Sequence, residues 1–137
     1  MKKYKRLCFI FLFFPFFVSA NETESTFFTC YKKNENAVQV TACLDNALRS
    51  SNLKLNKLEQ HLVSSFFALG QLTGSDQVVS AFDNAKRDFK TWKESHCRMV
   101  ESSFQLDASR QQAYLSCLID LTEEQYKKLM RFADMNL

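Results

Sequence analysis

The sequence predicts a small all-α domain, an antiparallel bundle of three helices clamped by disulfide bonds. Three observations lead to this class. After residue 20 the chain has no proline and only two glycines, Gly70 and Gly74, which is too few turn residues for a sheet-rich domain. Its apolar residues recur at three- and four-residue steps, the period of an α-helix. Four cysteines, an even number, follow residue 20 in this short chain.

The first twenty residues have the form of a secretory signal peptide. Four basic residues precede an apolar run from Leu7 to Val18, and Ser19-Ala20 supplies the small residues that signal peptidase requires. The run is shorter than the roughly 18 residues that a membrane anchor needs. We therefore expect cleavage near Ala20 and a mature domain of residues 21–137 with no membrane anchor. The expected location is periplasmic or secreted, in a bacterium.

Removing this segment changes the net charge. The whole chain has 18 Lys plus Arg against 15 Asp plus Glu. Four of the basic residues and none of the acidic ones precede residue 20, so 14 remain against 15 and the mature charge is −1. Such a chain gives no argument from net basicity for a nucleic-acid partner, and we expect none.

The four cysteines of the mature chain predict two disulfides, because exported chains meet an oxidising environment. They are Cys30, Cys43, Cys97 and Cys117. A metal site is not expected, since there is no Cys-x-x-Cys pair and the only histidines are His61 and His96. Four cysteines allow three connectivities, and the residues alone leave all three open. A turn near Asp107 would bring the cysteines together at one end of the bundle.

Residues 21–34 are mostly polar and predict an irregular lead-in. A first helix is expected from about Asn36 to Gly70, and Ser50-Ser51-Asn52 leave open whether it is continuous or divides into two, which would make a four-helix bundle. Its predicted apolar face consists of Val40, Leu44, Leu48, Leu55, Leu58, Leu62, Phe66 and Leu69. Residues 71–76 predict a loop in which Ser75 or Asp76 caps the next helix.

A second helix is expected from Val78 to about Phe104, with a heavily aromatic apolar face. Asp107 is the predicted N-cap of a third helix. That helix is expected to bury Tyr114, Leu118, Leu121, Gln125, Leu129 and Phe132. Short loops between three such helices predict an up-down-up bundle.

The segment from Ala85 to Cys97 resembles a helix of the LprI-type lysozyme inhibitor domain of exported bacterial proteins. The resemblance continues at the pair Leu55-Asn56 and at the segment that begins with Cys117, so it spans nearly the whole mature chain. The positions that match the family motifs are Leu55, Asn56, Ala85, Phe89, Trp92, Lys93, Glu94, Leu121 and Thr122. Phe89 stands where the family has Trp, and Lys93-Glu94 stand where it has Arg-Asp.

This resemblance implies an exported inhibitor that binds and blocks a lysozyme-like muramidase. The alternative is a cell-envelope interaction or immunity protein with a different protein partner, because a fold does not fix a ligand. Neither function needs a cofactor. The inhibitor would only have to cover the cleft whose two carboxylates cleave the polysaccharide.

Three features suggest chemistry, and each has a simpler explanation. Phe89 and Trp92 suit a carbohydrate-stacking platform, but their helical spacing favours core positions. His96 beside Cys97 suggests a thiol catalyst, yet adjacent helical residues do not face each other. Glu94 and Glu101 suggest paired catalytic carboxylates, whereas their basic neighbours favour surface ion pairs. With no catalytic triad or phosphate loop in the sequence, we predict no catalytic residue and no enzyme activity.

Overall fold

A computed structural model describes residues 25–136, with side-chain surroundings described up to residue 134. These residues form four α-helices and no strand. The helices are α1 (Thr26–Lys33), α2 (Ala37–Thr73), α3 (Gln77–Ser102) and α4 (Asp107–Asn136). The predicted all-α, disulfide-clamped bundle is confirmed. The expected signal peptide and its cleavage site lie outside the described residues.

The longest helix, α2, is continuous over 37 residues, which answers the question left open at Ser50-Ser51-Asn52. Ser51 is buried there, and its hydroxyl donates a hydrogen bond of 3.1 Å to Glu123 Oε1 on α4. The helix begins after Asn36, whose side-chain oxygen accepts from the Gln39 N–H at 3.0 Å. Because Ser51 has a hydrogen-bond partner on α4, it is part of the packing between the two helices and does not interrupt α2.

The predicted end of this helix at Gly70 is wrong by one turn. Gly70 stays helical, and α2 ends at Gly74, which has φ 69° and donates its N–H to the Gly70 carbonyl at 2.8 Å. Of the two glycines, only Gly74 takes the left-handed conformation that terminates a helix. Ser75 caps α3 by accepting from the Gln77 N–H at 3.4 Å, whereas Asp76 makes no side-chain capping bond.

The expectation of an irregular lead-in before residue 34 is also wrong. Residues Thr26–Lys33 form α1, which begins after Ser25, and the Ser25 side chain accepts from the Phe28 N–H. Cys30 is buried on this helix, and Phe27 packs against the same core. Two helical turns present too few apolar residues to establish a period, so the pattern along the chain did not predict them.

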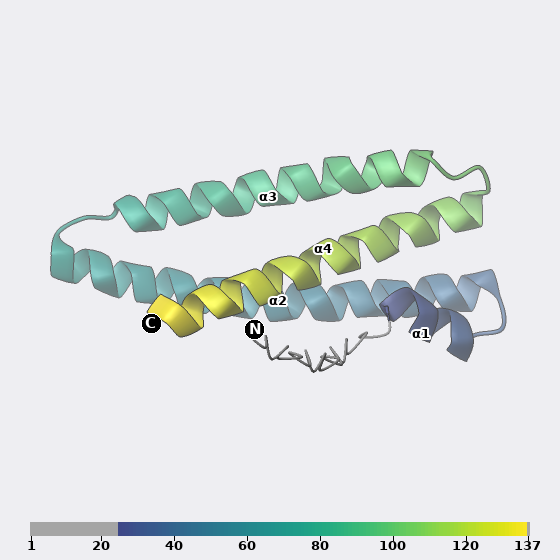
Figure 1. Cartoon of the computed structure of the whole chain (residues 1–137), viewed down its shortest axis with the longest axis horizontal. Coiled ribbons are helices and arrows are strands. Elements are labelled where there is room, and N and C mark those ends of the chain that lie inside the picture. The colour runs from purple at the N-terminus through teal and green to yellow at the C-terminus, as the bar shows by residue number, and fades with distance from the viewer. Residues whose placement is uncertain (1–24, 137) are drawn as a thin grey trace, which may run out of the picture.

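The fourth helix packs along both α2 and α3, and Figure 1 shows it crossing obliquely between them. Asp107 is the first residue of α4 and not its N-cap, because the Leu106 carbonyl accepts the Arg110 N–H at 2.8 Å. The preceding helix ends at Ser102, two residues before the predicted end.

The buried line of α4 differs from the predicted one. Its buried residues are Leu115, Leu118, Ile119 and Thr122. Of the six expected residues only Leu118 is buried; Tyr114, Leu121, Gln125 and Leu129 are half-buried, and Phe132 is exposed. Because α4 lies between two helices, the residues that face both of them are the buried ones. On α2 the predicted face is correct except that Leu48 is half-buried and Leu69 is exposed.

The two disulfides join cysteines that are neighbours in sequence. Cys30–Cys43 links α1 to α2, and Cys97–Cys117 links α3 to α4, with Cα–Cα distances of 5.7 and 5.6 Å. The connectivity that the sequence left open is thereby settled. In Figure 1, α1 and the turn between α3 and α4 lie at the same end of the bundle, as the cysteine spacing predicted.

None of the helices within residues 25–136 combines the length and the apolar character that a membrane span requires.

Candidate functional site

Trp92 lies at the surface with 52% of its area exposed, so the prediction that it is a core residue is wrong. The inward positions on this part of α3 belong to Lys93 and Cys97, which are 9% and 0% exposed. A helical period identifies a stripe but does not say which edge of it is buried. The edge that carries Trp92 faces away from α4.

Trp92 belongs to a row of side chains along one flank of α3, which we call the aromatic ridge. It consists of Phe89, Trp92, His96 and Met99, at the three- and four-residue steps that align on a helix. The Trp92 ring stacks on His96 with centroids 5.2 Å apart and lies 6.2 Å from Phe89. Met99 is 60% exposed. Trp92 and Met99 are the exposed members of the row, and Phe89 and His96 are half-buried. Exposed apolar side chains of this kind are typical of protein-interaction surfaces.

On the other side of Phe89, a cleft of about 470 Å³ opens between α2 and α3 above α4. Its lining residues are Leu48, Asn52, Leu55, Asn56 and Glu59 from α2, Lys86, Arg87, Phe89, Lys90, Lys93 and Glu94 from α3, and Tyr114 and Leu118 from α4. We call it the α2–α3 cleft. Its volume falls within the range that holds small ligands.

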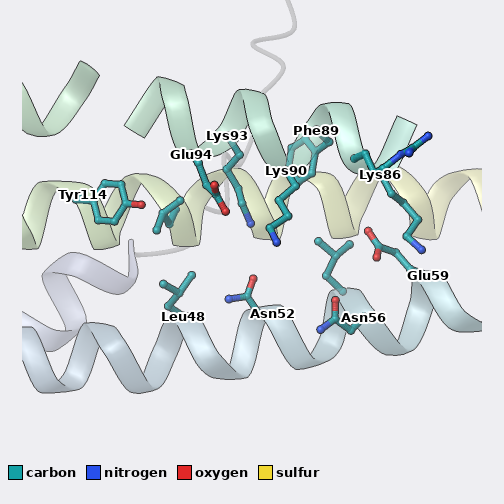
Figure 2. A pocket seen from close by; sticks show the side chains of 13 residues that line it. Leu48, Asn52, Asn56, Glu59, Lys86, Phe89, Lys90, Lys93, Glu94 and Tyr114 are labelled. Carbon is teal, nitrogen blue, oxygen red and sulfur yellow. The ribbon is translucent and has the colours of Figure 1, made fainter. Parts of the chain in front are cut away.

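Polar side chains from the two long helices converge on this cleft. Figure 2 shows Asn52 and Glu59 rising from α2 toward α3, while Lys86 and Lys90 extend from α3 toward α2; Asn56 lies on α2 between Asn52 and Glu59. Four basic residues and two acidic ones line the space, so its walls carry an excess of positive charge.

Lys93 is the most deeply placed of these basic residues. Its ammonium donates a 2.8 Å hydrogen bond to Thr122 Oγ1, and the Thr122 hydroxyl donates to the Leu118 carbonyl at 2.6 Å. The ammonium also lies 5.4 Å from the centroid of the Phe89 ring. Burial lowers the pKa of Lys93, and the neighbouring carboxylates of Glu94 and Glu59 only partly oppose that effect.

Glu59 responds to burial in the opposite direction. Loss of solvent raises the pKa of its carboxyl group, against the attraction of Lys86 and Lys93. Burial therefore disfavours the charged forms of both Glu59 and Lys93, on opposite walls of one cleft.

The nine family-motif positions separate into three environments. Leu55, Asn56, Phe89, Lys93 and Glu94 line the α2–α3 cleft, and Thr122 lies beneath it as the partner of Lys93. Trp92 and Ala85 are exposed, and Leu121 is half-buried. The sequence did not identify Lys93 as a buried group. Its position four residues before Cys97, on the same face of α3, is the signal that marks it.

The features that suggested catalysis do not form a catalytic site. Cys97 is oxidised in a disulfide, and His96 stacks on Trp92. Glu101 pairs with Arg98 at 3.0 Å, a surface contact. In the part of the chain that the structure describes, no group of three or more His, Cys, Asp or Glu side chains is placed to hold a metal ion.

Comparison with known protein families gives one match. The model of the family "Lysozyme inhibitor LprI" matches residues 30–129, which include the four disulfide-bonded cysteines, the aromatic ridge and the lining of the α2–α3 cleft. No curated protein and no solved structure matches the chain.

Proposed function

The chain belongs to the LprI family of lysozyme inhibitors, and from this premise we propose that it binds and blocks a lysozyme-like muramidase. Muramidases cleave their polysaccharide between two carboxyl groups in an open cleft. A protein that covers this cleft inhibits the enzyme without any chemistry of its own. The family supports an inhibitor and not a catalyst.

The exposure of Trp92 is the observation that supports the aromatic ridge as the docking face. Trp92 occupies a family-motif position, yet it contributes more than half of its surface to solvent. Tryptophan is enriched among the residues that dominate binding energy at protein interfaces. The aromatic ridge is therefore the surface that we assign to the contact with the muramidase.

The ridge is held in place before binding. Trp92 contacts ring neighbours on both sides along α3, and the Cys97–Cys117 disulfide fixes α3 to α4 one residue after His96. Side chains that are already ordered lose less entropy when a partner docks. A mature charge of −1 gives little long-range attraction to a basic enzyme, so affinity has to come from contacts of this kind.

The proposal includes export of the chain and removal of residues 1–20. Two disulfides in a domain of this size are typical of proteins that work in an oxidising compartment, where peptidoglycan and muramidases also meet. The leader-like pattern at the N-terminus supports the same location.

The test is inhibition of peptidoglycan lysis by lysozymes of several classes, with oxidised residues 21–137 and with its Trp92→Ala variant. We expect stoichiometric inhibition by the unmodified protein. The variant should inhibit at least about 30-fold less well, the effect of losing roughly 2 kcal/mol at an interface hot spot. Its free energy of unfolding should fall by no more than about 1.5 kcal/mol, because only ring contacts at the surface are lost.

Phe67→Ala is the matched control, since Phe67 is an aromatic residue on α2 with 60% exposure and lies outside the ridge. It should leave inhibition unchanged. Equal inhibition by Trp92→Ala and unmodified protein would remove the ridge from the contact. No inhibition of any lysozyme class at micromolar excess would favour the alternative, an envelope interaction or immunity protein with another partner.

A further inference from the structure

The α2–α3 cleft has features that a protein-docking ridge does not require. Its basic side chains are the first of them. Within residues 25–136, neither Lys90 nor Lys93 forms a salt bridge, and the hydrogen bond of Lys93 goes to an uncharged hydroxyl. A buried ammonium is costly unless a charge of opposite sign pairs with it. Lys90 and Lys93 thus provide an anion-binding position in the middle of the cleft.

The amide side chains are the second feature. Asn52 and Asn56 are four residues apart on α2, so they share one face, and both line the cleft. Figure 2 shows Asn52 opposite Lys90 and Lys93. An amide both donates and accepts hydrogen bonds, as a ligand hydroxyl or acetamido group requires. The two amides lie beside the position of Lys90 and Lys93, where they can contact the uncharged part of a ligand.

The third feature is the pair of carboxylates, Glu59 and Glu94, together with the apolar side chains of the cleft. Glu59 lies near Lys86 at one end, and Glu94 lies beside Lys93, with Tyr114 beyond it at the other end. Carboxylates accept hydrogen bonds from hydroxyl groups but repel an anion, so they favour a negative charge at Lys90, which extends between Glu59 and Glu94. Leu55, Leu118 and the Phe89 ring supply apolar surface against which a sugar ring can lie.

We propose that the α2–α3 cleft binds a sugar that carries a carboxylate. The carboxylate pairs with Lys90 and Lys93, and the ring hydroxyl or acetamido groups bond to Asn52, Asn56 and Glu59. This site adjoins the aromatic ridge, with which it shares Phe89, and it goes beyond inhibition of a muramidase. Two sources share the required chemistry: the lactyl ether of a muramic acid and the carboxylate of a uronic acid.

Isothermal titration calorimetry on oxidised residues 21–137 tests the site directly. The probes are N-acetylmuramic acid, glucuronic acid, and N-acetylglucosamine, which lacks the carboxylate. We expect at least one acidic sugar to bind at millimolar concentration or below, about tenfold or more tighter than the neutral sugar, because hydrogen bonds between charged groups are the stronger ones. The acid that binds identifies the source.

Three results would overturn the proposal: no binding of either acid, equal binding of the neutral sugar, or complete displacement of the acid by an equal concentration of acetate. The last result would reduce the site to one for any carboxylate. None of these measurements uses a muramidase, so their outcome is independent of the inhibition assay.

The Lys90→Gln variant places the ligand. Lys90 is exposed and makes no hydrogen bond within the described chain, so its replacement should not disturb the fold. We expect affinity for the acidic sugar to fall about tenfold or more. Lys57→Gln, at an exposed position on α2 outside the cleft, and Trp92→Ala on the ridge should bind as the unmodified protein does. Unchanged affinity of Lys90→Gln would contradict the assignment.

Discussion

At the end of the bundle where α1 lies, the core around Cys30, Val40 and Leu44 is crosslinked by a disulfide, and a second one holds α3 to α4. At the opposite end, Leu58, Leu62 and Phe66 pack against α3 and α4, and no disulfide joins the helices within the described residues. The first core contains no fully buried aromatic residue. In the second, Phe66 meets Phe82 and Phe132 with centroids 5.3 and 6.0 Å apart.

The difference shows two ways to hold helices together in one small domain. Covalent bonds limit the freedom of the unfolded chain, and the crosslinked end is held without a buried aromatic ring. The other end depends on the burial of large rings. The α2–α3 cleft lies between these two ends of the bundle. There α4 forms the floor of the cleft, and many of the side chains that line it are polar. This arrangement leaves the middle of the molecule open without separating its ends.

The largest expected effect is at the end without a disulfide. Phe66 is 5% exposed and lies at the centre of its ring cluster, so Phe66→Ala leaves a cavity and should lower the free energy of unfolding by about 3 to 5 kcal/mol. Urea denaturation of the oxidised protein measures it. Phe67→Ala, at the adjacent exposed position, should change stability by less than about 0.5 kcal/mol. A similar small loss for both would mean that the ring cluster is not what holds this end.

Removal of one disulfide should lower the free energy of unfolding slightly less than Phe66→Ala does. The double variant Cys97→Ala, Cys117→Ala is expected to lose about 2 to 4 kcal/mol, because an unfolded chain without that crosslink is freer. Cys30→Ala with Cys43→Ala should fall in the same range, and the same denaturation experiment compares them. If either pair could be removed without loss, the contrast between a covalent and an aromatic end would fail.

The smallest effect concerns the cleft and depends on pH. The pKa of Lys93 is lower in the folded protein than its ordinary value of 10.5, so the unfolded chain binds more protons as pH approaches that value from below. Stability from this group therefore rises with pH in that window. Relative to Lys93→Met, the unmodified protein should gain stability between neutral pH and pH 10.5. A pH-independent difference would contradict the burial of the amine.

Much of this fold could be predicted from the sequence because the apolar period of α2 is long and unbroken. Val40, Leu44, Leu55, Leu58, Leu62 and Phe66 were all identified and are all buried. The failures have physical causes. A two-turn helix such as α1 shows no period, and a helix packed between two others, as α4 is, buries a line that its apolar residues alone do not define.

The candidate site was less predictable, since an apolar pattern gives no weight to polar residues that point inward. Lys93 on α3 and Thr122 on α4 form a hydrogen bond with each other, and nothing in the sequence around one residue indicates that the other is its partner. For the same reason Trp92 was assigned to the core. Which of two adjacent residues, Trp92 or Lys93, faces α4 depends on a hydrogen-bond partner that lies 29 positions away.

The order of the cysteines along the chain has a consequence for biosynthesis. Each disulfide joins a cysteine to the next one in sequence, 13 and 20 positions apart. An oxidant that couples cysteines in the order in which they emerge during synthesis or translocation therefore makes the native pairs directly. Pairing in that order does not require the slow reshuffling of incorrect disulfides.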